Sequence, residues 1–201
     1  KSVWARNAPV LFPIVGKLKD NTYEYAGKEY HLPQHGFARD KEFKVIEKKA
    51  DSILLELKQT EETYLMYPFH FDLRILYELS GQLVKCTYTV VNSGTKELYF
   101  SIGAHPGFIC PMFPDEKLAD YRIEFEEPEK SRRRLLNDGL FNGAHETVFS
   151  EPGSFQLSQS LFDKDAIVFD DLKSSSLKLI SEKYCLNFTW FNMPYFGIWT
   201  K

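Results

Sequence analysis

Residues 71–90 read FDLRILYELSGQLVKCTYTV, and this stretch carries the pattern that decides the fold. Apolar side chains alternate with polar ones on both sides of Ser80-Gly81-Gln82. A period of two is typical of strands with one buried face, and the glycine between the two runs is typical of a turn. We therefore predict an antiparallel hairpin with strands at 71–79 and 84–90.

The same period recurs along the rest of the chain. Two further hairpins with short polar turns are predicted within 22–31 and 43–58. Five more stretches rich in β-branched and aromatic residues are predicted to be strands: 98–102, 121–125, 166–170, 177–181 and 186–191. No stretch between them holds a helical stripe of typical length, and 111–120 is predicted to be a loop with one short helical turn. The predicted fold class is all-β, a large antiparallel β-sandwich.

Length and charge narrow the class of protein. The chain has 201 residues, of which 43% are hydrophobic, and this predicts a single domain, residues 1–201. The net charge is −3 and the basic residues are dispersed, so we expect neither a nucleic-acid nor a membrane partner. The one basic run, Arg132-Arg133-Arg134, follows several glutamates and is interpreted as a solvated strand edge or loop.

Cysteine usage and the chain ends bear on location. The three cysteines are widely spaced and match neither a disulfide framework nor a zinc-binding pattern, which favours a reducing, cytoplasmic setting. No stretch has the pattern of a signal peptide or a membrane span. The chain begins with Lys1 and ends in a strand-like run, so we interpret it as a segment of a longer protein, truncated at both ends.

Two short blocks each place a histidine beside glycine and an aromatic residue: His35-Gly36-Phe37-Ala38-Arg39 and Gly103-Ala104-His105-Pro106-Gly107-Phe108. Histidine can give and take a proton near neutral pH, and a neighbouring glycine lets the backbone approach a ligand closely. Phe37 and Phe108 could form an apolar wall. The blocks therefore predict a proton-transfer site. The alternative is that both histidines are structural residues of the core or of turns.

A metal site is not predicted. His31 and His35 have a helical metal-ligand spacing, but Pro33 between them prevents a helix. We expect no metal and no other cofactor.

Several blocks in a fixed order carry a family resemblance. They are PVLFPIVGKL at 9–18, HGFAR at 35–39, Tyr67-Pro68-Phe69, GAHPGF at 103–108 and DAIVF at 165–169. Together they resemble the aldose 1-epimerase (galactose mutarotase-like) superfamily, and most of all its LacX-type branch. The resemblance covers nearly the whole chain. It implies a β-supersandwich, present here as an incomplete segment, with the active site on the concave face of its main sheet.

The resemblance also implies a reaction and roles for residues. The family opens a sugar ring by acid and base catalysis and closes it on the other face, which interconverts the α and β anomers. By position in the motifs, His105 matches the acid and His35 the histidine that holds and polarises the sugar ring. Lys17 stands where many members carry a substrate-binding arginine, and Asp165 matches a carboxylate that accepts hydrogen bonds from sugar hydroxyls. The family's base is a glutamate, which we expect beyond Lys201.

Three functions remain open at this point. The first is an isomerase, an aldose 1-epimerase acting on a free aldohexose of the galactose type. The second is a hexose-6-phosphate 1-epimerase, in which Arg39, Lys17 and Arg6 would hold the phosphate. The third is a non-catalytic carbohydrate-binding protein. In each case the partner is a small sugar, Trp199 is predicted to stack on it, and the protein is expected to be a monomer or homodimer.

Overall fold

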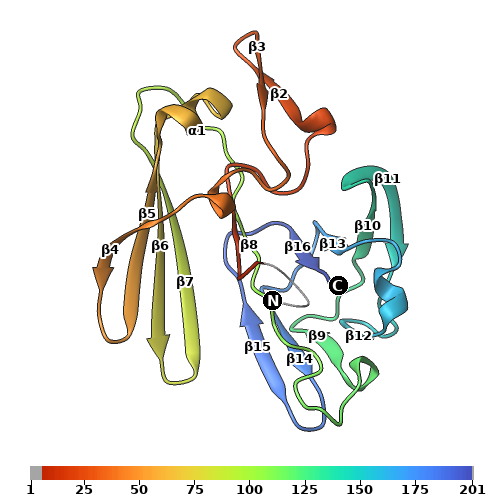
Figure 1. The fold of residues 1–201 in the computed structure, drawn as a ribbon. Coiled ribbons are helices and arrows are strands. Elements are labelled where there is room, and N and C mark those ends of the chain that lie inside the picture. The colour runs from red at the N-terminus through yellow and green to blue at the C-terminus, as the bar shows by residue number, and fades with distance from the viewer. Residues whose placement is uncertain (1–5, 201) are drawn as a thin grey trace. The chain divides into compact units, whose positions relative to one another are not determined.

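The computed structural model of the protein describes residues 6–200 (Figure 1). The paired strands are antiparallel, and the one α-helix of the described residues is short. The chain divides into two compact units, which we call the N-terminal unit (residues 8–105) and the C-terminal unit (residues 106–200, with residues 6–7). Among the described residues, no helix has the length and apolar character needed to cross a membrane. The single-domain organisation stays a prediction.

A four-stranded sheet is the main element of the N-terminal unit, drawn in orange to yellow-green in Figure 1. Its strands, in sheet order, are β4 (Lys44–Lys48), β5 (Ser52–Lys58), β6 (Phe71–Ser80) and β7 (Leu83–Asn92). β6 and β7 pair without interruption from Phe71 opposite Asn92 to Ser80 opposite Leu83, and Gly81 turns the chain with a φ of 58°. The hairpin predicted at 71–90 is confirmed.

Two smaller β elements complete this unit. β2 (Thr22–Tyr25) and β3 (Lys28–His31) form the second predicted hairpin, and β1 (Val10–Leu11) pairs with β8 (Gly103–Ala104). The strand predicted at 98–102 is wrong. Its apolar side chains Leu98 and Ile102 pack against the core, but the backbone there joins no ladder. Alternation of side chains therefore reports burial on one face, and pairing needs a neighbouring strand as well.

Helix α1 (Glu61–Met66) was not predicted, because six residues are too few for a periodic stripe. It begins with a capping box in which the Thr60 hydroxyl accepts from the Thr63 N–H at 3.2 Å, and the Thr63 hydroxyl accepts from the Thr60 N–H at 2.9 Å. Short 3-10 turns complete the helical elements of the two units: η1 (Lys19–Asn21), η2 (Ala38–Asp40), η3 (Leu118–Asp120) and η4 (Gln159–Phe162). The η3 turn is the one predicted within 111–120.

Aromatic side chains fill the core of the N-terminal unit. The Phe12 ring lies 5.0 Å from that of Phe71 and 6.0 Å from that of Tyr67, between ring centroids. Phe37 is 3% exposed and packs on Phe12 and Phe71, so it is a core residue and not the predicted wall of a ligand site. This core fixes the positions of both the 12–18 segment and the 35–40 segment, which carry predicted site residues.

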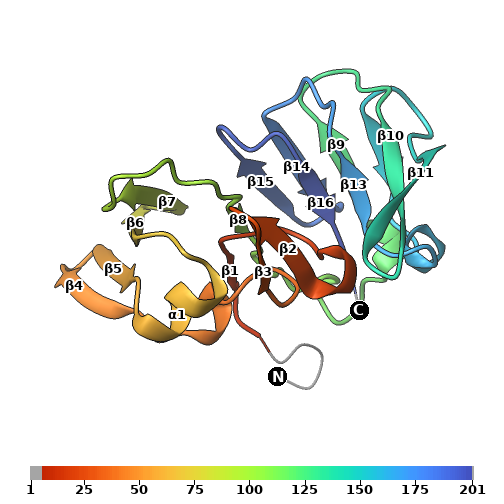
Figure 2. The ribbon, with the colours of Figure 1, turned by 90° about the horizontal axis from the view of Figure 1, so that it is seen from above.

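Two four-stranded sheets make up the C-terminal unit (Figure 2). One contains, in sheet order, β12 (Ser154–Gln156), β9 (Arg122–Phe125), β14 (Ser176–Ile180) and β15 (Cys185–Thr189). The other contains β11 (Leu140–Thr147), β10 (Arg132–Asn137), β13 (Ile167–Phe169) and β16 (Phe196–Ile198). Phe125 of the first sheet meets Phe169 of the second at 5.9 Å between ring centroids, in a core shared by both. The four strands predicted at 121–125, 166–170, 177–181 and 186–191 are present as β9, β13, β14 and β15.

The basic run lies on β10, and its middle residue corrects the sequence interpretation. Arg133 is 4% exposed, and its Nε donates to Glu146 Oε2 at 3.0 Å. Lys164 donates to the other oxygen of Glu146 at 2.7 Å. The alternation of side chains along a strand turns Arg133 inward between its exposed or half-exposed neighbours, so the run is not uniformly solvated.

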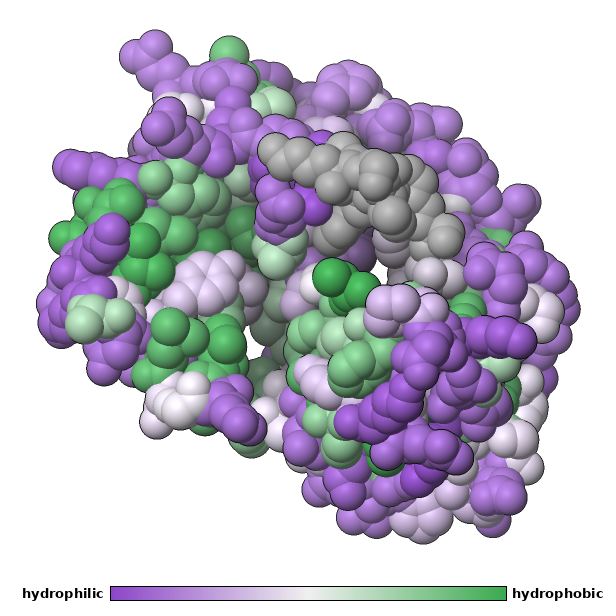
Figure 3. All heavy atoms as spheres, turned by 60° about the horizontal axis from the view of Figure 1, so that its bottom comes forward, coloured by the Kyte–Doolittle hydropathy of each residue, from purple (hydrophilic) through white to green (hydrophobic). Residues whose placement is uncertain are grey.

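Surface hydropathy is mixed. The turn end of the β6–β7 hairpin exposes Leu79, Leu83 and Val84 at 55%, 59% and 63%. The space-filling view of Figure 3 shows apolar residues among hydrophilic ones on the face toward the viewer.

Candidate functional site

His35 lies in the turn between β3 and η2 and has an unusual backbone conformation. Its φ is 64°, in the left-handed region, and Gly36 follows with a φ of 69°. A Cβ on Gly36 would stand 2.2 Å from the carbonyl oxygen of Phe12, so only glycine fits there. This close approach brings His35 against the 12–18 segment.

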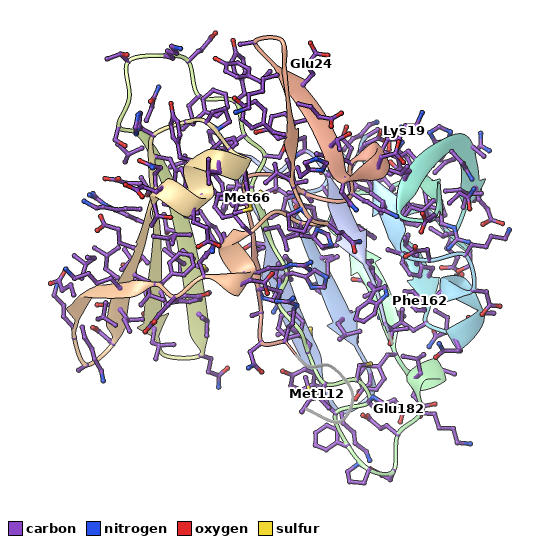
Figure 4. All side chains as sticks on the ribbon, turned by 45° about the horizontal axis from the view of Figure 1, so that its top comes forward. Lys19, Glu24, Met66, Met112, Phe162 and Glu182 are labelled. Atoms are coloured by element: carbon purple, nitrogen blue, oxygen red, sulfur yellow. The ribbon has the colours of Figure 1, made fainter. Side chains whose placement is uncertain are left out.

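Backbone groups of that segment hold His35. The His35 N–H donates to the Gly16 carbonyl at 2.7 Å, and the Gly16 N–H donates to Nδ1 of the His35 ring at 3.0 Å. The Phe12 N–H donates to the His35 carbonyl at 3.2 Å. The imidazole is therefore positioned by main-chain atoms, which keep their places when side chains rotate. In Figure 4, Lys19 marks the η1 turn that leads from this segment into β2.

The structure brings the two predicted histidines together. His105 directly follows β8, and the pairing of β8 with β1 places it near the segment that holds His35. The two ring centroids are 6.2 Å apart and the ring planes are nearly perpendicular, at 86°. Two groups able to transfer protons thus face one small region of the N-terminal unit.

The environment of His105 favours its neutral form. Desolvation by burial lowers the pKa of His105 below its usual 6.5, and the positive charge of Arg39 acts in the same direction. A hydrogen bond to its own backbone opposes both effects. Protonation of His105, which a general acid requires, is therefore disfavoured in the protein without sugar.

The two cationic residues predicted for the site also lie in this unit. Arg39 is on η2 with 17% of its side chain exposed, and its Nε lies 3.7 Å from Asp40 Oδ2. Lys17 is half-buried and follows Gly16 in the segment that contacts His35. The effect of Arg39 on the pKa of His105 shows that this guanidinium belongs to the same electrostatic environment.

Asp165 and Trp199 lie in the C-terminal unit. Asp165 has a φ of 71° and its Oδ1 accepts from the Ala166 N–H at 2.6 Å, so its side chain caps its own turn. Trp199 follows β16 and is 43% exposed. Their roles in sugar binding stay predictions.

A cavity of about 490 Å³ lies in the N-terminal unit, a volume in the range of small-molecule sites. Pro13, Ile14 and Leu18, from the segment that holds His35, form part of its lining, and four tyrosines contribute most of the rest. Glu24 and Met66, labelled in Figure 4, mark β2 and the end of α1 near it. The Tyr23 hydroxyl donates to the Met66 carbonyl at 2.9 Å. Neither histidine lines this cavity.

One site residue was missed. The family resemblance of the 9–18 block predicted a role for Lys17, whereas the contact to His35 is made by the backbone of Gly16. Every residue except proline carries the same N–H donor, so residue type does not reveal which one a histidine will meet. The sequence signal at this position is the glycine itself, and the structure adds that its φ is 83°.

Comparison with known proteins identifies the family. The family described as aldose 1-epimerase matches residues 1–195 of the chain. The chain belongs to the aldose 1-epimerase family. The resemblance inferred from the sequence motifs is confirmed at this level.

Similarity to individual proteins agrees with this assignment. The plasmid-encoded protein LacX of Lactococcus lactis subsp. lactis is 36% identical over 189 residues, which cover 90% of this chain and 63% of LacX. This chain therefore spans less than two thirds of that relative. The structure of a galactose mutarotase-related enzyme from Lactobacillus acidophilus is 36% identical, with a TM-score of 0.91 over 98% of this chain and 67% of its own. A galactose mutarotase-like protein from Lactobacillus casei is 28% identical, with a TM-score of 0.89 over 99% and 69%. The predicted fold class is confirmed as the all-β, galactose mutarotase-like fold.

Proposed function

We propose that the His35–His105 pair takes part in converting the α anomer of a free aldohexose of the galactose type into the β anomer. The observation that carries this proposal is the edge-on arrangement of the two rings, 6.2 Å between centroids, in a member of the aldose 1-epimerase family. Neither histidine is a fully buried core residue, so the purely structural alternative explains their placement less well.

The proposed reaction balances its protons. His105, once protonated, gives a proton to the ring oxygen of the sugar while a base takes the proton of the C1 hydroxyl, and the bond between C1 and the ring oxygen breaks. The open-chain aldehyde rotates about the bond between C1 and C2. Closure on the other face reverses both proton transfers and gives the other anomer. We assign no carboxylate of residues 1–201 to the base.

Other residues are proposed to hold the sugar. Lys17 and Arg39 of the N-terminal unit would donate to sugar hydroxyls, with the ammonium of Lys17 acting as a point donor. Asp165 would accept from hydroxyls and Trp199 would stack on the ring. A neutral His105 in the protein without sugar would acquire its proton during the catalytic cycle, so we expect sugar binding and protonation to be coupled.

The test is mutarotation of freshly dissolved α-D-galactose, followed by polarimetry with the protein that carries this chain. His105→Asn removes the ring that would protonate the sugar, and we expect the rate to fall by about a hundredfold to ten-thousandfold. His31→Asn is the matched control, since His31 lies on β3 in the same unit with 73% of its side chain exposed. A His105→Asn protein that keeps most of its turnover would refute the assignment.

A phosphorylated sugar is the second candidate substrate. It is supported by the position of Arg39, whose charge acts on His105 and could pair with a phosphate beside the same ring. The same assay with galactose 6-phosphate distinguishes the two substrates. Preference for the phosphorylated sugar, lost in Arg39→Gln, would favour this candidate. Binding of sugar with no acceleration by the protein would favour a non-catalytic carbohydrate-binding role.

A further inference from the structure

Gly16 and His35 exchange two hydrogen bonds, and this exchange constrains the chemistry of the ring. The His35 N–H donates to the Gly16 carbonyl at 2.7 Å, and the Gly16 N–H donates to His35 Nδ1 at 3.0 Å. A backbone amide N–H is only a donor and does not titrate in the physiological range. Nδ1 must therefore be the acceptor in this contact.

An imidazole that accepts at Nδ1 has its proton elsewhere. The neutral ring carries a single N–H, so acceptance at Nδ1 places that proton on Nε2. Protonation of Nδ1 would direct two N–H groups at each other and break the contact. If Nε2 kept its proton as well, the ring would become a cation beside His105, whose pKa the positive charge of Arg39 already lowers.

We propose that Gly16 is a positioning residue that fixes His35 as the neutral Nε2–H tautomer, so that the ring presents Nε2–H to the sugar as a hydrogen-bond donor. The ligand named here rests on the proposed function, whereas the tautomer follows from the contact alone. The two backbone contacts with Gly16 thus hold the His35 ring in a single protonation pattern.

The glycine at 16 is required by its backbone conformation and not by crowding. Its φ is 83°, yet a Cβ there would have no heavy atom within 4 Å. Gly27, in the β2–β3 turn, has a φ of 73° and equally open surroundings. Gly16→Ala and Gly27→Ala therefore impose similar backbone strain, and only the first strains the backbone whose N–H faces His35.

The direct test is long-range 1H–15N correlation spectroscopy of the histidine rings in uniformly 15N-labelled protein without sugar. Signals of His35 are assigned by their loss in His35→Asn. At neutral pH we expect Nδ1 of His35 to give the shift of an unprotonated nitrogen and Nε2 that of a protonated one. A protonated Nδ1, or fast exchange between the two tautomers, would overturn the proposal. This readout needs no sugar, so its failure is distinct from failure of the proposed function.

The variants Gly16→Ala and Gly27→Ala form a matched pair that tests the role of Gly16. In Gly16→Ala we expect the His35 signals to move toward a mixture of tautomers and the KM for D-galactose to rise, while Gly27→Ala leaves both unchanged. Equal effects of the two substitutions, or unchanged His35 signals in a folded Gly16→Ala protein, would contradict the role of Gly16. Circular dichroism of both variants identifies loss of fold. If Gly16→Ala does not fold, the wild-type spectrum still decides the tautomer.

Two substitutions of His35 distinguish the hydrogen bond that the ring accepts at Nδ1 from the one that it would donate from Nε2. Asparagine tolerates a positive φ and offers Oδ1 as an acceptor for the Gly16 N–H, but it has no donor in the place of Nε2. Glutamine can place an amide donor near the position of Nε2. We expect His35→Asn to bind D-galactose about tenfold more weakly by calorimetry, the loss of one hydrogen bond, and His35→Gln to recover part of that loss. Wild-type affinity in His35→Asn would show that no donor at Nε2 is used.

Discussion

Arg133 of the C-terminal unit and Arg39 of the N-terminal unit are both largely buried arginines, but they affect their surroundings differently. Arg133 donates to Glu146 at 3.0 Å, and Lys164 pairs with the other oxygen of the same carboxylate, so Arg133 lies in a local ion-pair network. Arg39 lies 3.7 Å from its carboxylate neighbour Asp40, and its charge reaches the ring of His105. Removing one partner of a buried ion pair destabilises the fold, and a positive charge near a histidine lowers the pKa of that histidine.

Glycines extend this comparison to the backbone. Gly36 and Gly153 each have a positive φ, and an added Cβ would lie 2.2 Å from the Phe12 carbonyl oxygen and 2.5 Å from that of Glu127, respectively. One close approach positions a predicted site residue, and the other supports the loop before β12. The same kind of close approach thus positions a predicted site residue in one unit and a loop in the other.

The largest expected effect comes from Gly36→Ala. Steric conflict with Phe12 and strain at φ 69° should together cost about 3 kcal/mol of unfolding free energy, measured by urea denaturation. Gly153→Ala should destabilise to a similar extent. We expect only Gly36→Ala to displace the ring signals of His35 in the folded protein. If both variants leave His35 unchanged, the close approach at Gly36 does not position it.

Arg133→Met is expected to have the next largest effect. It leaves Glu146 with Lys164 alone and should lower the unfolding free energy by about 2 kcal/mol. Mutarotation per folded molecule should be unchanged. Denaturation curves and polarimetry on the same samples check both statements, and a selective loss of turnover would contradict a purely structural role for Arg133.

Arg39→Gln should change the pKa of His105 more than it changes the free energy of unfolding. Burial and the charge of Arg39 both lower the pKa of His105, so removing the charge should raise it toward 6.5. If protonated His105 is the acid, kcat/KM falls as the pH rises through this pKa, and the falling limb should move to higher pH in the variant. NMR titration of His105 gives the pKa directly. Arg74→Gln is the control, because Arg74 pairs with Glu56 at 3.0 Å, and it should leave the titration unchanged.

The smallest expected effect is on how the free energy of unfolding depends on pH. Because the pKa of His105 is lower in the folded protein than the usual 6.5, the unfolded chain binds more protons as the pH falls below 6.5. His105 should therefore reduce stability in that window and leave it unaffected at higher pH. Urea midpoints of wild type and His105→Asn should diverge below pH 6.5, with the variant losing less stability. Parallel curves through this range would contradict the lowered pKa.

Local patterns determined much of the fold in advance. The β2–β3 and β6–β7 hairpins follow from alternation on both sides of a two-residue or glycine-containing turn, which specifies pairing between neighbours in sequence. The strand predicted at 98–102 fails because alternation there has no partner strand. Strand β11 (Leu140–Thr147), which was not predicted, is exposed along most of its length, so no buried face marks it in the sequence.

The sequence by itself determined that this chain forms antiparallel β-structure, that its motifs are those of the aldose 1-epimerase family, and that His35 and His105 are candidate site residues. These features depend on residue type and on the order of residues that are close together in the chain. Only the tertiary structure decided that the two rings meet edge-on and that the Gly16 N–H faces Nδ1 of His35. It also decided that the charge of Arg39 lowers the pKa of His105 and that Arg133 pairs with Glu146. The physical reason is that backbone donors are nearly identical at every position and charges act through space, so their partners exist only once distant segments have packed together.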